Sequence, residues 1–155
     1  MKKKVLIGFM MVTSLFLTGC TSGKETVTKC ELNNNSSSVY SIKATYNIYS
    51  KNNIVTKVVT KEEATSENKD VLDTLESTLN STYKKASKSY GGYKYDVKRD
   101  DNKVTSNVTI DYTKMDMNKF IKENTALKSY ANKNNKLTKE GVKKIYTSMG
   151  ATCEK

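Results

Sequence analysis

The chain has 155 residues, a mass of 17.4 kDa and a formal charge of +11, because 27 lysine and arginine residues outnumber 16 acidic ones. This length favours a single domain. The sequence contains no histidine, which excludes the commonest general base and metal ligand, and its three cysteines are too few for a disulfide-dense scaffold.

The N-terminus has the pattern of a bacterial lipoprotein signal. Residues 2–4 are three lysines, residues 5–17 are almost entirely apolar, and the sequence Leu17-Thr18-Gly19-Cys20 resembles a lipobox. We therefore expect residues 1–19 to be removed by cleavage between Gly19 and Cys20, and Cys20 to carry the lipid. An ordinary secretory signal and an uncleaved anchor are the alternatives.

Removal of the signal leaves 136 residues, and their charge is +8 because 24 basic residues remain against 16 acidic ones. We expect the lipidated cysteine and a short tether in residues 20–25, followed by one domain in residues 26–155. Five extended residues reach about 17 Å, so the domain is expected close to the extracytoplasmic face of the cell membrane.

The two remaining cysteines, Cys30 and Cys153, lie near the ends of the predicted domain. An exported protein meets a compartment in which disulfides persist, so these residues favour one bridge that closes nearly the whole domain. Two free buried thiols are the alternative. A metal site of two thiols without histidine is a poor zinc site.

Alternating patterns in the first half of the domain predict strands. Residues 27–32 form a first strand, residues 38–50 alternate polar and apolar side chains, and residues 54–60 are rich in β-branched side chains after a turn at residues 51–53. Residues 62–69 are polar and are expected to lead into a helix.

The second half combines helical and strand patterns. Residues 72–90 carry an apolar stripe with helical spacing that stops at two glycines, and residues 93–98 and 104–112 form a second predicted hairpin. Residues 115–121 predict a short helix, residues 122–136 are left unassigned, and Thr138 caps a last helix that ends near Gly150. The order indicates an α+β fold, with an antiparallel sheet of four to five strands and two to three helices packed on one face.

Several short patterns occur together in a characteristic order. They are Cys20, Cys30, residues 93–97, residues 109–116 and the closing sequence Gly150-Ala151-Thr152-Cys153. In this order the chain resembles the YehR-like family of small bacterial lipoproteins over essentially all of its mature length. The resemblance implies an α+β domain with a lipid anchor and an unassigned function, and it implies no catalytic residue.

The chain contains no sequence motif of a nucleotide-binding loop, a nucleophile elbow or a zinc protease. Two pairs of acidic residues, Asp100 with Asp101 and Asp111 with Asp116, offer carboxylates to a hard cation, but a solvated turn and a helix start explain them more simply. We therefore expect no catalytic residue, no metal and no cofactor.

The expected function is a non-catalytic binding or interaction module at the cell envelope. The candidate binding residues are the cations of the second hairpin, Lys94, Lys98, Arg99 and Lys103. Its expected partners are an anionic envelope polymer, lipid headgroups or an acidic protein, and not nucleic acid. A substrate-capturing subunit of a transporter, a carboxylate-dependent hydrolase and a merely solvated face of mixed charge are the alternatives.

Overall fold

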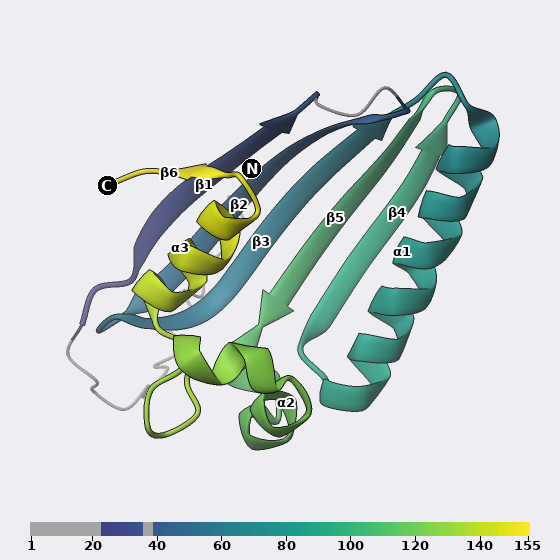
Figure 1. Ribbon diagram of the computed structural model, residues 1–155. Coiled ribbons are helices and arrows are strands. Elements are labelled where there is room, and N and C mark those ends of the chain that lie inside the picture. Colours follow the sequence, from purple (N-terminus) through teal and green to yellow (C-terminus); the bar gives the residue numbers. More distant parts are fainter. Residues whose placement is uncertain (1–22, 36–38) are drawn as a thin grey trace, which may run out of the picture.

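The computed structural model describes residues 23–35 and 39–155, which form one antiparallel sheet with helices on one face (Figure 1). The six strands have the spatial order β4-β5-β3-β2-β1-β6. The fold is therefore α+β, as expected, with one strand more than predicted. The strands are β1 (Thr26–Asn34), β2 (Ser41–Lys51), β3 (Ile54–Thr65), β4 (Tyr93–Asp100), β5 (Lys103–Asp111) and β6 (Thr152–Cys153).

The additional strand is β6, which the sequence suggested only as a tail. It pairs with β1 through two residue pairs, Cys30 with Cys153 and Glu31 with Thr152. A two-residue strand is too short to show an alternating pattern of polar and apolar side chains, so no local sequence pattern predicts it.

Strand β3 runs five residues beyond its predicted end, into a segment that was expected to lead into the helix. Glu62 is paired with Ala44 on one side and with Ser106 on the other. A strand with a neighbour on each side has its backbone hydrogen bonds satisfied, so this central position keeps polar residues in extended structure.

Three helices lie on the same side of the sheet (Figure 1). Helix α1 (Lys69–Tyr90) packs on β4 and β5, where Tyr83 contacts Tyr95 with ring centroids 5.7 Å apart. Helix α3 (Lys139–Ser148) packs on β2 and β3, and its Tyr146 stacks on Tyr46 at 4.0 Å. The short helix α2 (Met117–Glu123) buries Phe120 and Ile121 at one end of the sheet.

Residues 122–136, which the sequence left unassigned, fold into the end of α2, a 3₁₀ helix and a turn. The 3₁₀ helix η2 covers Thr125–Tyr130, and a second one, η1, covers Tyr112–Lys114 after β5. Leu137 is only 2% exposed, and its carbonyl accepts a hydrogen bond from the Val55 amide at 3.0 Å. This contact fixes the segment before α3 to the start of β3.

Candidate binding surface on the open face of the sheet

Within residues 23–35 and 39–155, the helices that pack on the sheet lie on one of its faces, and the other face carries no helix. The register places Lys94, Thr109, Val59, Asn47 and Lys29 side by side across five strands on this open face. Side chains alternate between the two faces along a strand, so residues i and i+2 lie on the same face. A second row follows, formed by Asp96, Asn107, Lys61, Thr45 and Glu31.

The open face contains two adjoining hollows. The larger has a volume of about 510 Å³ and is lined by residues of both rows, including Asn47, Asn107 and Lys94. The smaller, of about 320 Å³, lies over β1, β2 and β3, and the two hollows share Thr45 and Lys61. Threonine and asparagine side chains beside lysines suit a ligand with many hydroxyl or anionic oxygen atoms.

Charges of both signs meet on this face. Lys61 lies 2.9 Å from Glu63 and Lys98 lies 3.3 Å from Asp96, and each of these four side chains is substantially exposed. The hydrogen bond from Lys61 lowers the pKa of Glu63. Such exposed pairs contribute little to stability, so they remain open to competition by another anion.

Besides Lys57, whose ammonium lies 4.0 Å from the centre of the Tyr49 ring, three lysines of the open face lack such a partner. In the described part of the chain, no carboxylate lies within ion-pair distance of Lys43, Lys94 or Lys103. Lys94 projects from β4, and Lys103 begins β5 opposite Asp100. They are the cations of this face that are readiest to meet an anionic ligand.

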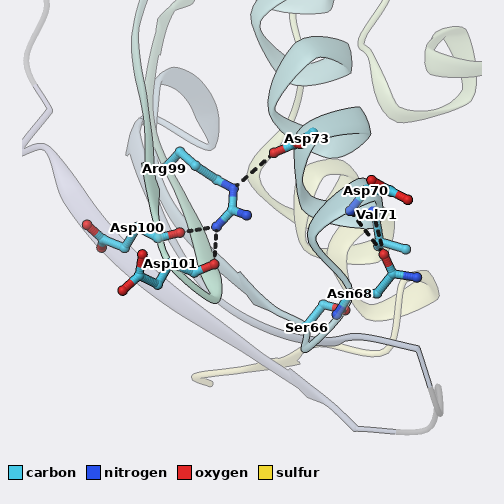
Figure 2. A network of polar contacts seen from close by, with 8 residues as sticks. All are labelled: Ser66, Asn68, Asp70, Val71, Asp73, Arg99, Asp100 and Asp101. Carbon is cyan, nitrogen blue, oxygen red and sulfur yellow. Dashed lines mark hydrogen bonds and ion pairs between the residues drawn. The ribbon is translucent and has the colours of Figure 1, made fainter.

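The structure brings together three of the four predicted cations. Lys94, Lys98 and Lys103 share the open face, but Arg99 lies on the helix-covered face opposite Val104. Its Nε atom is 3.5 Å from Asp73 of α1, and its guanidinium also donates to the carbonyls of Asp100 and Asp101 (Figure 2). The expected clustering of Arg99 with the other cations is therefore wrong, because strand alternation turns it toward α1.

The sequence prediction missed the polar residues contributed by the other strands. Lys43, Thr45 and Asn47 come from β2, Lys61 from β3 and Asn107 from β5. Their alternation was visible in the sequence, but their position beside β4 depends on the pairing of β3 with β5, which joins two hairpins separated by a helix.

A second polar cluster lies on the helix-covered face, around Glu62. One oxygen of this carboxylate accepts a hydrogen bond from Tyr46 and the other accepts one from Ser106, both at 3.3 Å. Burial and the charge of Glu62 together raise the pKa of Tyr83 to about 12. Burial likewise raises the pKa of Tyr146. This network keeps one carboxylate satisfied among neutral hydroxyl groups, so it provides a structural contact.

Of the two acidic pairs that were considered for cation binding, Asp111 and Asp116 act as helix caps, whereas Asp100 and Asp101 lie at the turn between β4 and β5. Asp111 accepts hydrogen bonds from the amide and hydroxyl of Thr113, and these bonds lower the pKa of its carboxyl. Asp116 accepts from the Lys119 amide at the start of α2. Across residues 23–35 and 39–155, no group of three histidine, cysteine or acidic side chains has a geometry suited to a metal ion.

Cys30 and Cys153 form the expected disulfide. Their Cα atoms are 3.9 Å apart, which is closer than the expected separation of about 4.4–6.8 Å because the two residues face each other directly across β1 and β6. The predicted cleavage site and lipidated residue, Gly19 and Cys20, lie outside the described residues. Within the described residues, no helix has the length and apolar character needed to cross a bilayer.

Comparisons with known proteins give structural neighbours only. No protein-family model and no curated protein matches the chain. The Escherichia coli YehR protein, solved by NMR, is 17% identical over 85% of this chain and 92% of its own, with a TM-score of 0.54. A Streptococcus pneumoniae TIGR4 protein, also solved by NMR, is 16% identical over 99% and 97%, with a TM-score of 0.48. The likeness to YehR confirms the expected resemblance, and at this identity it shows the fold alone.

Proposed function

We propose that this protein is a lipoprotein, anchored through Cys20 at the extracytoplasmic membrane face, and that it acts there as a non-catalytic binding module. Its open sheet face would take an anionic polymer of the cell envelope. The observation that carries this proposal is the open face itself, where lysines, carboxylates and the side chains of threonine and asparagine line two adjoining hollows.

The composition of the open face supports a polymer more than a small solute. The hollows adjoin each other across several strands, so a long ligand can contact both at once. Anionic oxygens would meet Lys61 and Lys94, while hydroxyl groups of the ligand would meet Asn47 and Asn107. Many weak contacts spread along a polymer add up to useful affinity without a deep pocket.

The anchor is tested by substituting the lipidated cysteine. We expect Cys20→Ala to leave a precursor that keeps its signal, visible as a larger mass than that of the wild-type protein. The wild-type protein should be found in the membrane fraction with two or more acyl chains, which suffice for stable attachment. An unlipidated mature protein as the main wild-type form contradicts the anchor.

The binding surface is tested on purified cell wall, with and without its anionic polymers. We expect the double variant Lys61→Glu/Lys94→Glu to bind intact wall about tenfold more weakly, since each charge contributes roughly 0.5–1 kcal/mol at an exposed site. The control Lys69→Glu/Lys144→Glu carries the same change of charge away from the open face and should bind as the wild type does.

Salt and ligand size distinguish the alternatives. Binding to the open face should weaken as salt rises, because exposed charges are screened within about 10 Å at 0.1 M. Equal binding to wall that lacks anionic polymer contradicts the proposal. Binding of a small anionic solute in place of the polymer favours the transporter-subunit alternative.

A further inference from the structure

The described chain enters the domain at one end of the sheet. Gly23 lies against Asn52 of the β2–β3 turn, so closely that a Cβ atom on Gly23 would overlap the Asn52 side-chain oxygen. Two residues later, Glu25 accepts a hydrogen bond of 2.9 Å from Thr56. The three-residue step from Cys20 to Gly23 spans at most about 10 Å. A lipid on Cys20 would therefore place this end of the domain beside the bilayer.

Several other segments meet at the same end, which is the lower end in Figure 1. The Lys139 amide donates to the carbonyl of Asn53 in the β2–β3 turn at 2.9 Å. The Asp116 amide donates to the carbonyl of Tyr90 at the end of α1 at 3.2 Å. These segments form one surface, which we name the tether-end surface. It consists of the tether, the β2–β3 turn, the last turns of α1, the segment from η1 to η2 and the start of α3.

The net charge of the domain is concentrated on the tether-end surface and the strand ends that adjoin it. Residues 23–28, 48–58, 84–93 and 110–140 contain 13 lysines and 5 acidic residues, a balance of +8. The remainder of residues 23–155 contains 11 basic and 11 acidic residues, a balance of zero. The opposite end carries Asp73, Asp100 and Asp101 around Arg99, and Asp70 lies in the first turn of α1 (Figure 2).

The lysines of this surface are largely available. Lys133 and Lys136 are exposed in the turn before α3, and Lys24 is exposed in the tether. In the described part of the chain, Lys114 with Asp111 is an ion pair within this surface, and none involves Lys51, Lys133 or Lys136. A patch of this kind attracts an anionic bilayer, and the attraction fades within a Debye length.

The same end also holds a hollow that has apolar side chains in its lining. It has a volume of about 670 Å³, and Ile54, Val55, Met115, Met117 and Leu137 line it together with Lys51 and Lys136. Apolar side chains beside lysines match the boundary between headgroups and acyl chains, where lysine stems lie along apolar surface and their ammonium groups remain in water.

We propose that the tether-end surface docks on the anionic headgroups of the membrane to which the protein is anchored. The orientation rests on the lipid anchor of the proposed function, whereas the attraction to anionic lipid does not. Since the strands run away from this end, docking would hold them upright on the membrane. The open face would then stand free at the side, and the end that carries Asp73, Asp100 and Asp101 would point outward.

The first experiment uses the mature chain, residues 20–155, expressed without the signal so that Cys20 carries no lipid, and measures its binding to vesicles of neutral lipid with and without 30% anionic lipid. Each lysine close to an anionic surface contributes about a fivefold change in binding. We therefore expect the triple variant Lys51→Glu/Lys133→Glu/Lys136→Glu to bind anionic vesicles about 100-fold more weakly than the wild type. No ion pair is broken by these changes, so folding should be kept, and the far-ultraviolet circular dichroism spectrum checks it.

The matched control is Lys61→Glu/Lys94→Glu/Lys98→Glu, which changes the charge equally on the open face. This control should bind envelope polymer more weakly and bind anionic vesicles as the wild type does. The tether-end variant should bind anionic vesicles more weakly and bind envelope polymer as the wild type does. Equal binding of the wild type to neutral and anionic vesicles, or a tether-end variant that binds as the wild type does, overturns the docking proposal.

Hydrogen exchange on the lipidated protein in vesicles tests the orientation separately. In anionic vesicles, we expect slower exchange at residues 51–54 and 131–138 than in neutral vesicles, and no change in the β4–β5 turn. Slower exchange on the open face instead contradicts the upright orientation. The mass of the same sample reports whether Cys20 is lipidated, so failure of the anchor is distinguished from failure of docking.

Discussion

Cys30 and Cys153 face each other across β1 and β6 and are joined by a disulfide that spans 123 residues of sequence. Cys30 is fully buried, and the Glu154 amide donates to the carbonyl of Lys29 at 2.9 Å beside the bridge. With only two residue pairs, β6 has too few backbone hydrogen bonds to hold the C-terminus alone, so the covalent bond fixes its place at the edge of the sheet.

Loss of this bridge should destabilise the domain strongly. In the chain-entropy model, a closed loop of this length contributes up to about 4–5 kcal/mol to the free energy of unfolding. We expect Cys30→Ala/Cys153→Ala and the reduced wild-type protein to unfold at clearly lower urea concentrations than the oxidised wild type. If reduction leaves the urea concentration at the unfolding midpoint unchanged, the disulfide does not stabilise the domain.

The tyrosines of the helix-covered face should make the protein sensitive to alkaline pH. Burial and Glu62 raise the pKa of Tyr83 to about 12 and also raise the pKa of Tyr46, while burial raises the pKa of Tyr112. An unfolded tyrosine ionises near pH 10. Above that pH the folded state binds more protons than the unfolded state, so the free energy of unfolding should fall as pH rises from about 10 to 12.

Tyrosinate absorbance at 295 nm measures the ionisation of these tyrosines directly. We expect part of the tyrosine absorbance to appear only above pH 10, together with unfolding. Glu62→Gln removes the negative charge beside Tyr46 and Tyr83 and should move their ionisation to lower pH. Glu63→Gln is the matched control, since this neighbouring side chain lies on the opposite face of β3; an equal shift in both variants is the result that would count against Glu62.

Gly92 should tolerate substitution less well than other glycines with positive φ. Its φ angle is +72°, and a Cβ atom would lie 2.5 Å from the backbone oxygen of Asp111. The Asp111 amide also donates to the carbonyl of Gly92 at 2.8 Å, so the two backbones cannot separate without losing this bond. We expect Gly92→Ala to cost at least about 1–3 kcal/mol of stability.

Gly150→Ala is the comparison for this change. Gly150 has a φ angle of +95°, but its added Cβ atom would meet Leu32 at 3.6 Å, an ordinary contact. Urea unfolding should therefore show a smaller loss for Gly150→Ala than for Gly92→Ala. Equal losses would show that backbone strain alone, without the Asp111 clash, sets the cost.

Local patterns predicted most of the elements. Period-two alternation predicted β2 and β5, and an apolar stripe with helical spacing predicted α1, which Asn68 caps with hydrogen bonds to Asp70 and Val71 (Figure 2). Thr138 caps α3 as expected, by accepting a bond from the Gly141 amide. These features depend on residues close together in sequence, and a single chain contains all the information they need.

The candidate surfaces depended on contacts between distant residues. Pairing of β3 with β5 places Lys61 beside Asn107, which creates the open face. Alternation turned Arg99 inward, but only the packing of α1 on β4 supplied Asp73 as its partner. The excess of lysine was visible in the composition, while its concentration at the tether end was not. The sequence by itself determined the local periods and the total charge; the tertiary structure decided which edges met and where that charge gathered, because strand order is set by long-range packing.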